Sequence, residues 1–459
     1  MNARIFLLSL FLVAGCEQAF ADCPSPANDE FDTVATALFN CSSARPLQGH
    51  ETDRKFQIHY DFPQTLPDAS TLPWMSIDPM ANPAGYLQAI LNYATRINAR
   101  DDVDWRIEDN EQESWCSAPW FHMLREPLHG MTSERWSRPK ELHELQGDWA
   151  RNWAVGIYND VACYGFGQIW KDPTFPKTKG FAFADGALAI KMLFTNAMPS
   201  QVPYLTGSKE WTVAANDDGS TITMRLLQLD VSTKDKRSPN GWFFGTFMYD
   251  ATQPGDTVWE RLVPVGLIWG NDNDLTAGAY LEKAAVAKES WVNPAVADRF
   301  YALPRHNLGL FGRANGPVDN PRSACISCHQ RALDWGRAVL RGSPEEKEAR
   351  LLLPDVPNDP FNDAAVKAYF RDIGNQSPVP NTQSMDYSLQ VSEGIEAFRT
   401  WVATAFPDHA TSTTDVTPYP FTSAAPIPTA PVTEAAPIEV PADKFEAGTI
   451  DIKSDLFVR

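Results

Sequence analysis

Three residues in one short segment have the types and the spacing for covalent cofactor chemistry. The segment is Cys325-Ile326-Ser327-Cys328-His329. Two thiols separated by two residues can reach the two vinyl groups of a haem, and the histidine that follows can bind the iron. We therefore expect Cys325 and Cys328 to form thioethers, His329 to be the proximal iron ligand, and the chain to carry one covalent haem c.

Three other roles fit a Cys-x-x-Cys pair: a redox-active dithiol, half of a zinc site, or an ordinary disulfide. A zinc site needs a second pair of ligands at compatible spacing, and none is evident in the sequence. A thioredoxin-like dithiol follows a βα pattern, which the residues before Cys325 lack. The histidine directly after Cys328 therefore favours haem over these alternatives.

The segment around the motif is basic, although the chain as a whole has a formal net charge of −19. Six arginines and two acidic residues lie between residues 305 and 341. Haem propionates are carboxylates, and the forked guanidinium of arginine binds carboxylates through two hydrogen bonds. Arg313 and Arg322 are therefore candidate propionate partners, whereas Arg337 and Arg341 fit a solvated helix face better.

The motif from Cys325 to His329 resembles the attachment segment of c-type cytochromes. In compact members of that group, the resemblance implies a methionine downstream of the haem histidine as the sixth iron ligand. Met385 is the only methionine after His329. His306 and His129 are rival sixth ligands, and an iron with an open sixth position is a further alternative.

A second resemblance involves two segments ahead of the motif. Phe-Ala-Asp-Gly at residues 183–186 and Gly-Trp-Phe-Phe at residues 241–244 resemble strands of cytochrome P460 and its c′-beta relatives. In that group a β-sheet packs on the haem and the attachment motif follows the sheet, so the resemblance implies the same arrangement here. This chain is much longer and continues past the motif. The lysine cross-link of that group has no assignable counterpart, Lys191 included.

Apolar periodicity predicts the elements before the motif. An apolar stripe with helical spacing runs over residues 86–97, residues 55–60 alternate as in a strand, and residues 153–170 fit a buried helix. Four segments rich in apolar, aromatic and β-branched residues, separated by turn formers, then predict an antiparallel sheet. These segments are residues 187–194, 221–231, 241–249 and 262–269. Residues 276–290 predict a helix, and residues 308–321 predict an irregular loop.

The chain after His329 has helical periodicity up to about residue 409. The predicted helices are residues 332–340, 344–353, 364–373 and 391–406. Beyond His409, threonine, alanine and proline dominate, and such a segment cannot bury enough surface to offset the cost of ordering. We therefore expect an α+β fold in four parts: a signal peptide, a mixed α/β domain with an antiparallel β-rich sheet and flanking helices, a helical haem-binding region, and a disordered tail. The parts are residues 1–21, 22–300, 301–409 and 410–459.

The first residues predict export. A charged start is followed by an apolar run that ends at Gly15 and is too short to span a bilayer. Signal cleavage after Ala21 is one outcome, and acylation of Cys16, which would give a lipid anchor, is the other. No later apolar run is long enough for a transmembrane helix. We expect a periplasmic or otherwise exported bacterial protein.

The cysteine count agrees with export. The chain has seven cysteines, so an even number remains once Cys16 is removed or acylated, which suits an oxidising compartment. If the motif cysteines hold haem, four are left for disulfides, with free buried thiols as the alternative. The simplest pairing by proximity joins Cys23 to Cys41 and Cys116 to Cys163.

Charge and motif together define two functional hypotheses. The strongly negative net charge excludes nucleic acid as a default partner and predicts a redox partner protein with a basic docking face. The first hypothesis is periplasmic electron transfer by a six-coordinate haem. The second is a haem-dependent oxidoreductase or gas-binding protein whose open iron handles peroxide, hydroxylamine or nitric oxide.

Arg125, Glu126 and His129 combine a base, an acid and an imidazole, as acid/base sites do.

Overall fold

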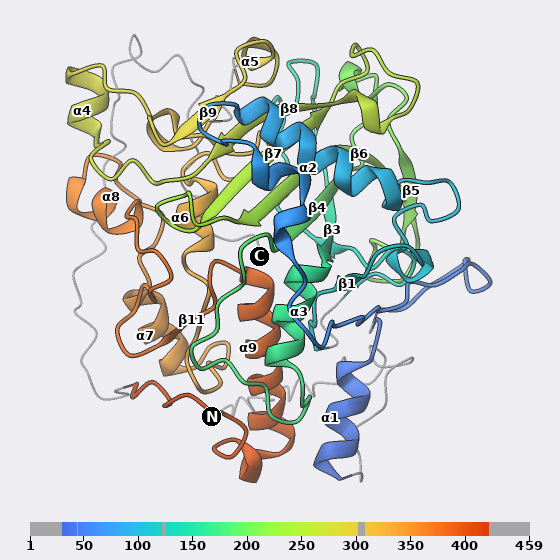
Figure 1. Ribbon diagram of the computed structural model, residues 1–459, viewed down its shortest axis with the longest axis vertical. Coiled ribbons are helices and arrows are strands. Elements are labelled where there is room, and N and C mark those ends of the chain that lie inside the picture. Colours follow the sequence, from blue (N-terminus) through green and yellow to red (C-terminus); the bar gives the residue numbers. More distant parts are fainter. Residues whose placement is uncertain (1–29, 44, 122–124, 302–307, 422–459) are drawn as a thin grey trace, which may run out of the picture.

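The computed structural model describes residues 30–43, 45–121, 125–301 and 308–421 (Figure 1). These residues form an α+β fold with a large antiparallel sheet and flanking helices, which confirms the predicted fold class. The predicted signal peptide, Cys16 and residues 422–459 of the predicted tail lie outside the described residues. Within the described ranges, no helix is both long enough and apolar enough to cross a bilayer.

The main sheet contains the four strands that β-branched and aromatic content predicts, together with shorter strands at its edges. Its strands are β1 (Trp115–Ser117), β2 (Thr132–Ser133), β3 (Asn152–Asn159), β4 (Leu188–Thr195), β5 (Glu210–Val213), β6 (Ile222–Lys234), β7 (Trp242–Tyr249), β8 (Leu262–Ile268) and β9 (Ser290–Val292). The hydrogen-bonded order is β1-β3-β4-β6-β7-β8-β9, with β2 paired to β3 and β5 to β6. All of these pairings are antiparallel.

Side chains on alternate residues of these strands point to opposite faces of the sheet. One face packs on helix α2 (Pro83–Asn98), which crosses the sheet in Figure 1. Gly245 of β7 lies so close to α2 that a Cβ there would be 2.2 Å from Cδ2 of Leu87 and 3.1 Å from Cγ2 of Val231. This face is therefore closely packed and apolar. The other face is turned toward the attachment motif.

Helix α2 forms as its apolar stripe predicts. It begins at Pro83 after the N-cap Asn82, whose side chain accepts a hydrogen bond from the N–H of Gly85. Its buried residues include the whole predicted stripe. The other helices are α1 (Phe31–Phe39), α3 (Asp160–Ile169), α4 (Ala277–Glu282), α5 (Ala297–Phe300), α6 (Cys325–His329), α7 (Pro344–Leu352), α8 (Asp363–Tyr369) and α9 (Leu389–Ala405).

Two predictions before the sheet are wrong. Residues 153–170 form not one helix but strand β3 followed directly by α3. The change occurs at Asn159, whose side-chain oxygen accepts from the N–H of Ala162 as a helix N-cap and from the N–H of Leu188 across the sheet. Residues 55–60 are extended but form no strand, since they bond mainly to loop neighbours, as in the Phe56 N–H donating to Pro127.

The region after the sheet is less helical than predicted. Only residues 277–282 of the predicted helix 276–290 are helical, and residues 332–340 contain the short strand β10 (Leu333–Asp334), paired with β11 (Gln383–Ser384). The helices predicted at 344–353, 364–373 and 391–406 form as α7, α8 and α9, and the loop at 308–321 is irregular apart from one helical turn at residues 310–312.

The described residues share one main hydrophobic core. It includes residues from both sides of the predicted boundary at residue 300, among them Leu229 and Ile395. Residues 410–421 were expected to belong to the tail but are folded: Tyr419 donates its N–H to Trp335, and Asp415 accepts from Thr178. Residues 410–421 therefore pack against the rest of the described chain.

A disulfide joins Cys116 of β1 to Cys163 of α3, as predicted. It holds the edge of the sheet against the helix that follows β3. The second predicted disulfide involves Cys23, which lies outside the described residues. Because structural disulfides persist in oxidising compartments, the Cys116–Cys163 bond supports a location outside the cytoplasm.

Candidate haem-attachment site

His329 is held in one orientation at the end of α6. Its Nδ1 lies 2.9 Å from the carbonyl oxygen of Tyr387. Because a carbonyl can only accept, Nδ1 carries the proton and Nε2 is the unprotonated nitrogen. The ring lies 4.7 Å from the ring of Phe244 in β7, measured between centroids. Nε2 makes no hydrogen bond to any of the described residues, so its lone pair is available to a ligand.

The segment that accepts this hydrogen bond is itself fixed by a buried carboxylate. Asp386, next to Tyr387, is fully buried and accepts hydrogen bonds from Lys234 Nζ at 2.6 Å, from Trp242 Nε1 at 3.0 Å and from the N–H of Phe183 at 2.8 Å. The segments 183–186 and 241–244, which carry the second resemblance, therefore meet at the residue beside the histidine anchor.

Burial also sets the charge state of the imidazole. It lowers the pKa of His329 to about 4, although the hydrogen bond to Tyr387 acts in the opposite direction. The ring is therefore neutral at neutral pH. A neutral imidazole that donates through Nδ1 to a backbone carbonyl and leaves Nε2 available is the usual state of a metal-binding histidine.

Cys325 and Cys328 lie one helical turn apart on α6 and are not joined by a disulfide. Sγ of Cys325 lies 3.5 Å from Oδ1 of Asn315. Burial, followed by the charges of Asp319 and Asp230, raises the pKa of Cys325 well above its ordinary value. The Cys325 thiol is therefore protonated at neutral pH. Neither cysteine borders the cavity described next.

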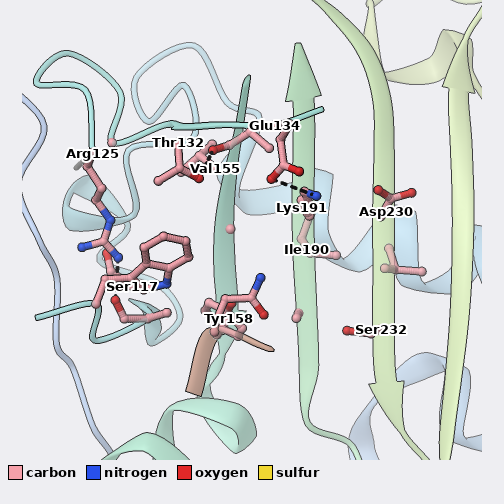
Figure 2. A pocket seen from close by; sticks show the side chains of 18 of the residues that line it. Ser117, Arg125, Thr132, Glu134, Val155, Tyr158, Ile190, Lys191, Asp230 and Ser232 are labelled. Carbon is pink, nitrogen blue, oxygen red and sulfur yellow. Dashed lines mark hydrogen bonds and ion pairs between the residues drawn. The ribbon is translucent and has the colours of Figure 1, made fainter. Parts of the chain in front are cut away.

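A cavity lies on the face of the sheet opposite to α2, and Figure 2 shows part of its lining. His329 is among the lining residues. About 780 Å³ of space free of protein atoms lies between the walls of the cavity, part of it open solvent. Its floor consists of side chains on β3, β4, β6 and β7, and small ones there leave the space unfilled. The floor residues on this face are Gly156, Tyr158, Ala189, Lys191, Asp230, Ser232 and Phe244.

Charged groups gather at one side of this cavity. Lys191 Nζ lies 3.0 Å from Oε1 of Glu134, and Asp230 is opposite Lys191 on the next strand (Figure 2). Burial opposes the charge of Lys191, but Glu134, Asp319 and Asp230 more than compensate and raise its pKa. Burial raises the pKa of Asp230, with Lys191 acting against it. Lys191 therefore remains an ammonium at neutral pH, partly buried beside Glu134 and Asp230.

Arg125 lies on the other side of the cavity, beyond strand β3 (Figure 2). Arg125 is buried, with 6% of its surface exposed. Its Nη2 donates to the carbonyl of Ala118 at 2.6 Å, and the guanidinium carbon lies 5.6 Å from the ring centroid of Trp120. Of the acid/base stretch singled out in the sequence, Arg125 is the member that lines this cavity.

The two arginines predicted to hold haem propionates are engaged elsewhere. Arg313 is fully buried and uses its donors on four backbone carbonyls. These belong to Asn271, Asp272, Leu275 and Leu310. Arg322 Nη2 donates to the carbonyl of Pro357. Arg313 therefore supports the neighbouring loops through its hydrogen bonds. Its predicted role as a propionate partner is wrong.

Glu126 and His129 have structural surroundings. Both carboxylate oxygens of the buried Glu126 accept backbone N–H groups, including those of Leu128 and Ala214. His129 stacks on Trp211 at 4.5 Å between ring centroids and lines a smaller neighbouring cavity. Burial lowers the pKa of His129 to about 4. The structure brings neither residue to the cavity that His329 lines.

The remaining sixth-ligand candidates differ in what can be said of them. Met385 is fully buried and is not among the cavity-lining residues. Its N–H donates to the carbonyl of Ala332, three residues after His329. It therefore lies in the segment that supports His329 from the Nδ1 side. His306 lies outside the described residues.

Sequence reasoning did not find the charged group formed by Glu134, Lys191 and Asp230. A signal was present at Lys191, the single charge of the otherwise apolar segment 187–194, because charged residues seldom lie in such segments unless they have a partner or a function. Pairing it with Asp230 required the register that sets the two residues opposite each other. Glu134 comes from a separate loop, and nothing local in the sequence indicates its approach.

The residues present fit a c-type haem in the chemistry of their donors. Two thiols and an oriented neutral imidazole lie on one short helix, and the unprotonated imidazole nitrogen belongs to a residue that lines a cavity. This combination matches what covalent attachment and axial ligation require. Comparisons of the chain with protein-family models, with curated proteins and with solved structures find no match.

Proposed function

We propose that this protein carries one covalent haem c on Cys325, Cys328 and His329, and that it is a haem-dependent oxidoreductase acting on a small molecule such as peroxide, hydroxylamine or nitric oxide. The observation that carries the proposal is the polar, titratable wall of the cavity next to His329. An electron carrier needs no such wall, because it only has to change oxidation state. An oxidoreductase needs groups that supply or accept protons.

When bound, haem supplies an iron that changes oxidation state and exchanges electrons with the substrate. The chain's own residues orient and protonate. His329, held through Nδ1 by Tyr387, keeps its Nε2 directed to its ligand. The ammonium of Lys191 can hydrogen-bond a bound substrate, and Asp230, whose pKa burial raises, can supply a proton to it and take one back from solvent. Asp230 stabilises the ammonium between turnovers.

The place of Met385 in the fold supports an open sixth position. If haem is held by His329, a second protein ligand would have to come from outside the segment that orients the His329 ring. Met385 belongs instead to the segment whose Tyr387 carbonyl binds the back of the His329 ring. We therefore propose that the sixth position faces the cavity. The alternative, an electron-transfer protein closed by Met385, predicts a different spectrum.

The deciding measurement is the absorption spectrum of the full chain, produced together with the enzymes that attach c-type haem. An alkaline pyridine spectrum reports covalent haem, and spectra of the reduced protein with and without carbon monoxide report the sixth position. We expect a high-spin haem that binds carbon monoxide quickly. The Met385→Leu variant should have an unchanged spectrum, whereas His329→Ala should lose the native spectrum.

Two results would contradict the proposal in different ways. Absence of covalent haem would remove it entirely. A low-spin haem that does not bind carbon monoxide, and that becomes high-spin in Met385→Leu, would favour the electron carrier. His143→Ala is a suitable control for His329→Ala. It removes an imidazole that lies outside the cavity and accepts a hydrogen bond from the N–H of Leu145.

We further propose that the protein works in the periplasm. The Cys116–Cys163 disulfide and the secretory character of the first residues support this. The net charge of −19 supports a redox partner with a basic docking face. The likeness to the cytochrome P460 and c′-beta group supports the same arrangement of sheet and haem, since the two quoted segments meet beside the histidine anchor at Asp386.

A further inference from the structure

Arg125 is a buried cation with no acidic partner among the described residues. None of the described carboxylates forms an ion pair with it, and the titratable groups that act on it are the phenols of Tyr60 and Tyr158. Burial lowers the pKa of Arg125. A guanidinium removed from water without a counter-charge is strongly unfavourable, so an anion at this position would stabilise the folded protein.

Two other buried arginines of the described chain, Arg399 and Arg313, have partners within the fold. Arg399 makes a two-pronged ion pair with Asp334, with nitrogen to oxygen distances of 2.7 and 2.6 Å. Arg313 is surrounded by backbone carbonyls. Arg125 differs from both because it lines a cavity while it donates from Nη2 to the Ala118 carbonyl. Its guanidinium is therefore the one of these three that faces space for a ligand.

The position of Arg125 relative to the motif indicates which anion this is. His329 lies beside Phe244 of β7, and Cys325 is close enough to Asp230 of β6 for that carboxylate to raise its pKa. Arg125 lies on the other side of the sheet order, next to Ala118, which follows β1. The cavity extends from His329 to Arg125, because both residues line it. A haem has its two vinyl positions on one edge and its two propionates on the opposite edge, so attachment to the cysteines directs the propionates away from α6.

We propose that Arg125 binds the propionate carboxylates of the haem and so fixes the edge of the ring opposite to the thioethers. This inference rests on the proposed function, because it requires haem at Cys325 and Cys328. The guanidinium can offer two parallel N–H donors to one carboxylate. Phe56 and Trp120, whose ring centroids lie 5.7 and 5.6 Å from the guanidinium carbon, hold the side chain in place for this contact.

The test compares the purified haem-bearing protein with Arg125→Met, Arg125→Lys and Arg45→Met. Arg45→Met removes the same charge outside the cavity, where Arg45 lies over Trp153 and 3.6 Å from Asp217. The readouts are the midpoint potential and the resonance Raman bands of propionate bending, both without substrate. Loss of the nearby positive charge favours ferric iron, so Arg125→Met should lower the potential and shift these bands. Arg125→Lys should shift them less, and Arg45→Met should leave them unchanged.

Each outcome separates the two proposals. If the unsubstituted protein carries no covalent haem, the proposed function fails before Arg125 is tested. If it carries haem, and the Arg125 variants retain both the potential and the propionate bands, the role of Arg125 is refuted while haem binding stands. Should Arg125→Met fail to fold, the Arg125→Lys variant decides by the same bands. Retained bands together with lost affinity for an added anion such as nitrite would assign Arg125 to the substrate instead.

Discussion

The two faces of the central sheet use the same strands for different purposes. On the face toward α2, Val231 and Gly245 pack so closely against Leu87 that there is no room for an additional atom. On the opposite face, Lys191 and Asp230 carry charge, and small residues leave a cavity beside His329. Successive side chains of a β-strand point to opposite faces of the sheet, so one strand can contribute to both faces. One face can therefore supply stability while the other holds partly buried charged side chains.

The largest effect should come from the packed face. Leu87 is fully buried, so Leu87→Ala should lower the free energy of unfolding by about 2–5 kcal/mol, because it leaves a cavity that the neighbours cannot fill. Ser232→Ala on the cavity face should change it by less than about 0.5 kcal/mol. Urea unfolding followed by tryptophan fluorescence measures both. Equal losses for the two variants would contradict the division between the faces.

An intermediate effect should come from the ammonium on the cavity face. Lys191→Met leaves Glu134 without its ion-pair partner and Asp230 without its nearest compensating cation. We expect a loss of about 1–3 kcal/mol at pH 7, between the values for exposed and buried pairs. The double variant with Glu134→Gln should recover part of it. A double-mutant cycle with no coupling would show that the pair does not contribute to stability.

The smallest effect should be a dependence of stability on pH. Burial, followed by the charge of Asp230, raises the pKa of Asp319 from 3.8 to about 7, while Lys191 and Arg135 act in the opposite direction and Glu134 in the same one. The folded protein therefore holds a proton that the unfolded chain releases between these values. This contribution to stability is complete below the lower value and is lost as the pH rises to the upper one.

Asp319→Asn should remove that loss. We expect the variant to gain about 1–2 kcal/mol relative to the unsubstituted protein between pH 4 and pH 8, a value reduced because the residue is only partly buried. Urea midpoints measured across this range provide the test. Asp298→Asn, at an exposed position of α5, is the matched control and should leave the pH profile unchanged. A profile that Asp319→Asn does not alter would exclude a raised pKa.

Local patterns in the sequence predicted what local physics decides. The stripe of α2 and the four long strands were correct, because their periodicity reflects burial on one side. The strand and helix at 152–169 were merged, since no glycine or proline separates them; the Asn159-Asp160 pair was the available helix-start signal. The order of strands, and hence the meeting of Lys191 with Asp230, depends on contacts distant in sequence.

The arginines illustrate the same limit at the site. Counting charges near the motif selected Arg313, whose donors are used on the carbonyls of neighbouring loops. Arg125 was noticed only for its neighbours Glu126 and His129. What distinguishes the two is whether a guanidinium is already satisfied inside the fold. That property depends on tertiary contacts, and no spacing rule in the sequence encodes it.

The hydrogen bond from His329 to Tyr387 implies an order of assembly. Its partners are separated by 58 residues, so the Cys-x-x-Cys-His segment leaves the ribosome well before the carbonyl that orients its imidazole. An emerging chain thus presents an accessible attachment motif whose histidine is still unaligned. Alignment comes with the final part of the fold, when Asp386 closes onto Lys234 and Trp242. If the protein carries haem as proposed, haem attachment and the alignment of His329 would be separate events in time.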